Sequence, residues 1–84
     1  MLSIIDESEK MRDERFVVRS YGFAELAQMY YPDRNERSAI RLFREELLVT
    51  RGLKDALVAL GYRRYNKILT RGQVQTIIQY LGEP

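Results

Sequence analysis

The sequence has no cysteine and no histidine among its 84 residues. Without cysteine, the chain has no disulfide, no thiol nucleophile and no cysteine zinc site. Without histidine, it lacks the commonest general base and the commonest metal ligand. We therefore expect that the protein is not an enzyme and that it uses no metal or cofactor.

Long apolar runs are also missing. The apolar start at residues 1–5 is followed at once by Asp6 and Glu7, whereas a signal peptide has a basic start and a longer apolar stretch. No run approaches the roughly 18–20 apolar residues of a membrane span. These features predict a cytoplasmic protein with no membrane association.

Hydrophobic residues make up 45% of the chain and charged residues 31%, which is typical of a small globular domain. Residues 6–15 differ from this average, because only Ser8 and Met11 in that stretch are uncharged. A stretch of mixed charge has little to bury. We predict a flexible charged tail at residues 1–15 and one folded domain at residues 16–84.

Charge is distributed unevenly along the chain. Residues 1–33 carry four Lys or Arg and seven Asp or Glu, a balance of −3, whereas residues 34–84 have a balance of +5. The overall charge of +2 hides this asymmetry. A basic body behind an acidic front indicates an anionic partner for the body.

Apolar spacing predicts a first helix at residues 23–30 and a second at residues 36–49. Pro32 ends the first helix, because the residue before proline is disfavoured in the α conformation. Either Asp33 or Asn35 can cap the second helix.

The same spacing predicts a third helix at residues 53–60, ended by Gly61, and a fourth helix that follows Thr70. Thr70 and Gln73 have the spacing of a capping box. The candidate core residues are Tyr31 and the apolar side chains at helical spacing: Phe23, Leu26, Ala27, Tyr30, Ala39, Leu42, Phe43, Leu47, Leu53, Ala56, Leu57, Leu60, Val74, Ile77, Ile78 and Leu81.

Two short segments carry the only strand signals. Residues 16–19 form a β-branched and aromatic run that predicts one strand, and the only candidate partner lies within residues 62–69. Residues 61–69 begin with glycine, alternate aromatic with basic side chains, and end apolar. They predict a basic loop or a small β-hairpin.

Arginines recur along the second helix at residues 34, 37, 41 and 44. At 100° per residue, Arg34, Arg37, Arg41 and Arg44 fall within an arc of about 80°, roughly opposite the apolar side. Such a stripe is either a solvated face or a surface that contacts anions. Solvated faces usually alternate in sign, whereas these neighbours are alike in charge. Arginine also suits phosphate and carboxylate. We favour the anion-contacting interpretation.

A second basic group lies at Arg63, Arg64 and Lys67, interleaved with Tyr62 and Tyr65. This mixture is typical of a nucleic-acid wing or a base-stacking surface. It is equally typical of a polar turn whose tyrosines cover the edge of the core. The sequence leaves both interpretations open.

Glu25-Leu26-Ala27, a turn, and the arginine-bearing second helix resemble a helix-turn-helix. The basic segment that precedes the Thr70-capped helix is similar to the wing of MerR-like and excisionase-like winged-helix domains. This resemblance implies that the second helix enters the major groove and that the wing touches phosphate. The turn at residues 31–35 is longer than in those domains and lacks their glycine, which changes the angle between the helices.

A broader resemblance extends over residues 16–84, to a family of short bacterial proteins known only as a domain of unknown function. It implies the boundaries of the fold and no activity. The residues that carry it are Tyr21, Gly22, Glu25, Leu26, Ala27, Tyr30, Pro32, Ala39, Gly61, Tyr62, Leu69, Thr70, Gln73, Val74, Leu81, Gly82, Glu83 and Pro84.

These observations predict a mainly α domain of four helices with a helix-turn-helix core and a small β wing or hairpin. The leading hypothesis is a DNA-binding or DNA-architecture accessory protein that contacts the phosphates of double-stranded DNA. The alternative is a protein–protein adaptor, in which the arginines meet an acidic partner, or a homodimer with no nucleic-acid role.

Overall fold

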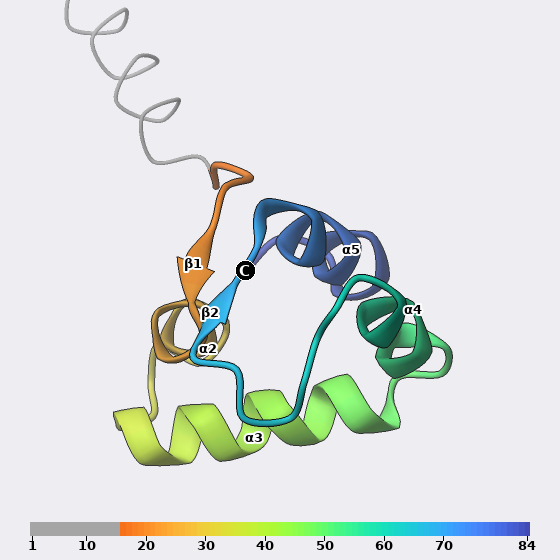
Figure 1. Ribbon diagram of the computed structural model, residues 1–84. Coiled ribbons are helices and arrows are strands. Elements are labelled where there is room, and N and C mark those ends of the chain that lie inside the picture. The colour runs from red at the N-terminus through yellow and green to blue at the C-terminus, as the bar shows by residue number, and fades with distance from the viewer. Residues whose placement is uncertain (1–15) are drawn as a thin grey trace, which may run out of the picture.

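The computed structural model describes residues 16–84 and shows, within that range, a mainly α domain with a small antiparallel sheet (Figure 1). Its elements are β1 (Tyr21–Gly22), α2 (Phe23–Tyr30), α3 (Glu36–Val49), α4 (Leu53–Ala59), β2 (Ile68–Leu69) and α5 (Arg71–Leu81). The four predicted helices and the small β element are confirmed. The predicted charged tail at residues 1–15 lies outside the described residues.

Helices α2 and α3 pack against each other and are joined by the turn at residues 31–35. The Glu25 carboxylate accepts a hydrogen bond from the backbone N–H of Gly22 at 3.2 Å, which fixes the start of α2. The Asn35 side chain accepts a hydrogen bond from the backbone N–H of Ser38 at 2.8 Å. Asn35 is therefore the residue that caps α3, and Asp33 does not.

Helices α4 and α5 form the second packed pair. Thr70 and Gln73 make the predicted capping box at the start of α5, since each side chain bonds the other residue's backbone N–H. The Gln73 amide also donates to the carbonyl of Leu60 at 3.0 Å and so ties α5 to the end of α4. Leu60 itself is 48% exposed, so its predicted place in the core is wrong. The reason is that α4 ends one residue earlier than its apolar spacing indicates.

The strand predicted at residues 16–19 lies instead at residues 21 and 22. Tyr21 pairs with Leu69, so the partner was correctly placed within residues 62–69. The aromatic ring of Phe16 stacks on that of Tyr21, with centroids 5.2 Å apart, and the Tyr21 hydroxyl donates to the carbonyl of Val17. Side-chain contacts therefore hold the segment before β1 in place of a strand ladder, and they include the Ser20 hydroxyl donating to the Leu69 carbonyl and the Arg19–Glu25 ion pair.

The buried apolar residues form one cluster to which all four helices and both strands contribute. Phe43 is central to it, because its ring lies 5.2 Å from that of Phe23 and 5.1 Å from that of Tyr30. The cluster comprises Tyr21, Phe23, Leu26, Ala27, Ala39, Phe43, Leu47, Leu53, Leu57, Tyr62, Leu69, Val74 and Ile77.

No helix within residues 16–84 is long and apolar enough to cross a membrane.

Candidate nucleic-acid interface

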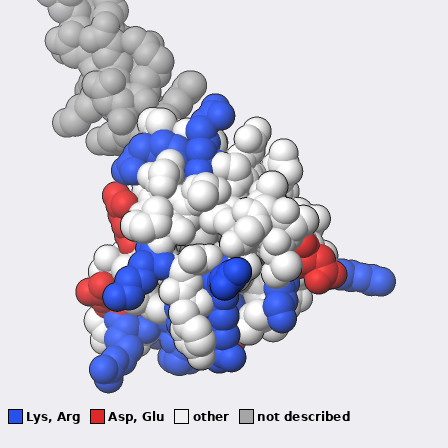
Figure 2. All heavy atoms as spheres, in the orientation of Figure 1, with Lys and Arg blue, Asp and Glu red and all other residues white. Residues whose placement is uncertain are grey.

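The rotation of α3 about its axis is set by the apolar residues that it buries. Ala39, Phe43 and Leu47 lie almost wholly inside the core and leave the opposite side of the helix in solvent. Arg37 and Arg41 are exposed on that side, as the sequence predicts. Figure 2 shows Lys and Arg side chains gathered over the part of the surface where Figure 1 has α3.

Arg34 precedes the helix and lies in the turn between α2 and α3. Its backbone N–H donates to the carbonyl of Tyr31 at 3.1 Å, and its side chain is exposed. Arg34 is therefore exposed just before α3, outside the helix on which its spacing placed it.

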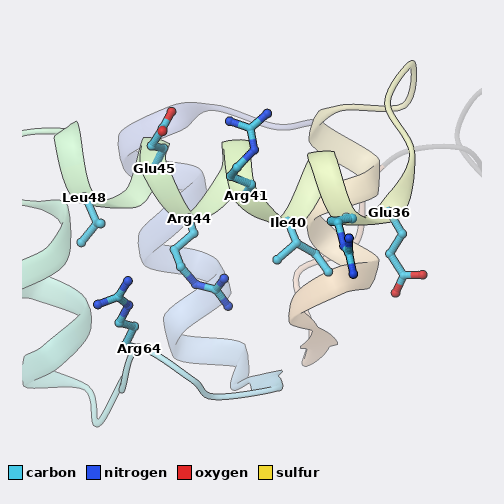
Figure 3. A pocket seen from close by; sticks show the side chains of 8 residues that line it. Glu36, Ile40, Arg41, Arg44, Glu45, Leu48 and Arg64 are labelled. Carbon is cyan, nitrogen blue, oxygen red and sulfur yellow. The ribbon is translucent and has the colours of Figure 1, made fainter.

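The arginines of α3 divide into two directions. Figure 3 shows Arg41 on the same side as Glu45, whereas Ile40, Arg44 and Leu48 project to the other side, toward the segment that carries Arg64. Helical geometry accounts for this division, because Ile40, Arg44 and Leu48 are spaced four residues apart and so follow one line along the helix. The predicted stripe is therefore not uniform.

A hollow of about 640 Å³ lies between α3 and the loop at residues 61–67. Two carboxylates, those of Glu36 and Glu45, also border the hollow. The arginines nevertheless outnumber them, so the hollow carries a net positive charge. Its other lining residues are Arg37, Ile40, Arg41, Arg44, Leu48 and Arg64.

Arg44 differs from the other arginines of the stripe because it is partly buried. Its guanidinium carbon lies 4.9 Å from the centre of the Phe23 ring, within the range of a cation–π contact. Its Nε atom is buried and has no hydrogen-bond partner among residues 16–84. Burial raises the pKa of Tyr62, and the positive charge of nearby Arg44 opposes that rise. Arg44 thus lies between the core and the hollow.

The loop at residues 61–67 is anchored at both ends. Gly61 begins it with a φ of 89°, a conformation that favours glycine, and the buried Tyr62 donates its backbone N–H to Leu57. At the other end, the Lys67 carbonyl accepts a hydrogen bond from the backbone N–H of Phe23 at 2.7 Å. These contacts fix the path of the loop beside α3.

Between its anchors, the loop presents its charged side chains to solvent. Asn66 closes a tight turn by accepting the backbone N–H of Arg63 at 2.6 Å. Arg63, Arg64 and Lys67 are exposed. The Arg64 guanidinium carbon lies 5.4 Å from the ring centre of Tyr65, which is 75% exposed.

The two tyrosines of the loop lie in different environments. Tyr62 is 8% exposed and belongs to the core, so it covers the edge of the core, as one of the two sequence interpretations proposed. Tyr65 lies outside the core and borders a second hollow of about 440 Å³ with Lys67, Ile40 and Arg44. This hollow adjoins the first along α3, since Arg44 and Ile40 line both.

The structure therefore brings together Arg37, Arg41, Arg44, Arg64 and Lys67 around two adjoining hollows. Arg34 and Arg63 are exposed but line neither hollow.

Sequence reasoning missed the separate environment of Arg44 and the carboxylates at the rim. The signal for Arg44 was available. It stands about 100° from Phe43 around the helix, whereas Arg41 stands about 160° away, so Arg44 lies nearer the buried side.

The two hollows offer charged side chains that can bind a ligand. Within residues 16–84, no group of three or more acidic side chains lies close enough to hold a metal ion. The charged groups at the hollows can donate hydrogen bonds to an anion, and arginine can do so with two N–H groups at once. The arrangement is suited to binding phosphate or carboxylate groups.

The comparison with protein families gives one match. The family model described as a domain of unknown function, DUF4248, matches residues 17–84, and the chain belongs to this family. Searches of the curated proteins and of the solved structures each found no significant match. The family assigns no activity, so the residues at the two hollows remain the basis for a function.

Proposed function

We propose that this member of the DUF4248 family binds double-stranded DNA through its phosphates, as an accessory or architectural protein of the cytoplasm that performs no catalytic step. The observation that carries the proposal is the hollow between α3 and the loop, where arginines from two separate segments meet. Like charges repel, so an anion bound in the hollow would relieve the repulsion between these arginines.

The order of the elements supports the same proposal. Helix α2, the turn at residues 31–35 and α3 follow one another as in a helix-turn-helix, and the basic loop at residues 61–67 comes after these helices in the chain, as a wing does. A helix of the length of α3, 14 residues, extends for about 21 Å, enough to follow a groove over several phosphates. In this proposal, the exposed arginines contact phosphates and position the helix. The contacts would come from Arg34, Arg37, Arg41 and Arg44 on the helix side and from Arg63, Arg64 and Lys67 on the loop.

The test replaces three exposed arginines, Arg34, Arg37 and Arg41, with glutamine in one variant. Binding to a mixed-sequence duplex is measured by fluorescence anisotropy across a salt series. Each phosphate contact contributes about −0.9 to the slope of log K against log salt, so the triple variant is expected to flatten the slope by roughly 2–3. Folding should be unchanged, because all three side chains are exposed.

A matched control removes the same charge elsewhere. Arg51, Lys54 and Arg71 are exposed and line neither hollow, so their triple glutamine variant has the same net charge as the first. The control should keep most of the salt slope. Equal losses in the two variants, or full affinity in the first, would contradict the proposal.

A second candidate function is favoured by a different observation. Three apolar side chains at the end of α3 and on α4 lie in solvent. Leu48 is 48% exposed, Val49 is 72% exposed and Val58 is 52% exposed. These side chains would suit a homodimer or an adaptor that meets an acidic protein partner. Light scattering with and without residues 1–15 measures the mass of the protein and so shows whether it forms a dimer. The DNA titration described above then shows whether that protein binds DNA. A stable dimer with no DNA affinity would favour the adaptor.

A further inference from the structure

Arg44 is set apart from the exposed arginines by its fixed position. Its guanidinium lies 4.9 Å from the ring centre of Phe23, and that ring is itself almost wholly buried. A long flexible side chain loses conformational freedom when it binds a ligand, and an arginine already held against a ring has less freedom to lose. Arg44 is therefore preorganised in a way that Arg37 and Arg41 are not.

Arg44 also holds a buried donor that has no acceptor. Its Nε atom has no hydrogen-bond partner among residues 16–84. A buried N–H that is left without an acceptor costs about 1–3 kcal/mol, so native structures nearly always pair such groups. The described part of the chain supplies no carboxylate for this role. An oxygen from a ligand in the hollow could fill it.

Arg64 approaches the same hollow from the opposite side. Figure 3 shows Arg44 extending from α3 and Arg64 extending from the loop into the space between these two segments. One turn away from Arg44 on either side, Ile40 and Leu48 are apolar, while the carboxylates of Glu36 and Glu45 also border the hollow. The anchored ends of the loop keep Arg64 near α3 without an ordered anion.

We propose that Arg44 and Arg64 form a seat for a single phosphate group, with Arg44 as the buried anchor and Arg64 as the outer contact. If the phosphate is part of DNA, this proposal rests on the proposed function. The seat would then bind one particular phosphate and so fix the position of the protein along the duplex. The same chemistry would hold inorganic phosphate or a nucleotide. The other arginines then supply diffuse attraction, whereas this pair supplies a discrete contact.

The first experiment uses inorganic phosphate as the probe and the arginine Nε–Hε signals of the full chain in NMR as the readout. Titration with phosphate at constant ionic strength should shift the Arg44 and Arg64 signals together, along one saturable curve. Arg51 and Arg71 are the controls, because both are exposed and line neither hollow. Shifts that do not saturate, or that are equal at Arg51 and Arg71, would overturn the seat.

Two conservative variants keep the test independent of folding. Arg44→Lys retains the charge but loses Nε and the planar fork, and Arg64→Lys makes the same change on an exposed loop. Each is expected to weaken phosphate binding by about tenfold, because paired hydrogen bonds are replaced by a point charge. Arg71→Lys is the matched control, because Arg71 is exposed and lines neither hollow, and it should leave the phosphate curve unchanged. Retention of wild-type phosphate binding in Arg64→Lys would overturn the pair.

A parallel titration with duplex DNA separates this proposal from the proposed function. Saturable phosphate binding at Arg44 without any affinity for DNA would keep the seat and contradict DNA binding. Salt-dependent DNA binding that is unaffected by Arg44→Lys and Arg64→Lys would keep DNA binding and overturn the seat. If both proposals hold, each variant lowers DNA affinity, while a nucleoside monophosphate competes only weakly with the duplex.

Discussion

The buried and arginine-bearing sides of α3 belong to one helix, yet different forces hold their side chains in place. Phe43 is fully buried and touches the rings of Phe23 and Tyr30, so packing fixes its position. Arg41 is exposed and is held by little beyond its own helix. Arg44 is intermediate, since its guanidinium lies near the Phe23 ring while it also borders the hollows.

This comparison shows that neighbouring elements, and not helical position alone, decide the role of each arginine. Helix α2 and the loop at residues 61–67 approach only one flank of α3, where they cover Arg44 and leave Arg41 in solvent. The proposed binding surface therefore has two parts. One part is held against the core at Arg44, and the other, at Arg41, is exposed and free to adjust to a ligand.

Phe43→Ala tests the buried side of α3 and has the largest expected effect on stability. Replacing a buried phenylalanine by alanine costs about 3–5 kcal/mol, partly through the cavity that remains. Domains of this size are near the low end of the usual 5–15 kcal/mol of stability, so the variant should retain only about 0–2 kcal/mol at 25 °C. Urea unfolding followed by circular dichroism measures the loss.

Arg41→Ala is the control on the other side of the same helix. Because Arg41 is exposed, its replacement should change the free energy of unfolding by no more than about 0.5 kcal/mol. Comparable losses in the two variants would contradict the division of α3 into a packed side and a solvated side.

The helices could be predicted from the sequence because their signals are local. The apolar spacing of α3 and the Thr70–Gln73 capping box each lie within a few residues of the structure that they specify. The strand could not be placed in this way. Residues 16–19 have the stronger strand composition, but the pairing with Leu69 depends on a contact 48 residues away in sequence from Tyr21.

The candidate site could be predicted in its charge and not in its shape. The arginines at helical spacing were visible in the sequence, and so was the basic loop. That the two segments share one hollow depends on the Phe23–Lys67 backbone hydrogen bond, which joins residues 44 positions apart. The burial of Tyr62 and the exposure of Tyr65 follow from the same long-range arrangement.

Tyr30→Phe tests a single contact on the packed side of α3 and has a smaller expected effect on stability. The Tyr30 ring stacks on Phe43, while its hydroxyl donates to the Gly82 carbonyl and so ties α2 to the end of α5. Removal of the hydroxyl should cost about 0.5–1.5 kcal/mol at neutral pH and leave the ring packing intact. Thermal unfolding at pH 7 measures this cost, and a change below about 0.2 kcal/mol would contradict the tie.

The same variant gives a pH dependence whose sign is fixed. Burial, together with the nearby charge of Glu83, raises the pKa of Tyr30 to about 12, from about 10 in the unfolded chain. The unfolded chain therefore loses this proton first, and the resulting stability declines as pH rises from 10 to 12. In Tyr30→Phe this part of the decline should be absent, so the stability difference between the variant and the wild type should shrink over that range. An undiminished difference at pH 12 would show that the hydroxyl ionises equally in both states.

Arg44→Met, compared with Arg41→Met, has the smallest expected effect on stability. It tests whether the fold needs the Arg44 guanidinium. Methionine keeps the length of the side chain beside Phe23 but removes the buried Nε that has no partner within residues 16–84. The loss of a cation–π contact worth about 0.5–2 kcal/mol is offset by relief of an unpaired buried donor worth about 1–3 kcal/mol. Arg44→Met should therefore match the wild type within about 1 kcal/mol in urea unfolding, and Arg41→Met within about 0.5 kcal/mol. Destabilisation by more than about 2 kcal/mol in Arg44→Met would show that Arg44 serves the fold, through Phe23 and Tyr62, and not a ligand.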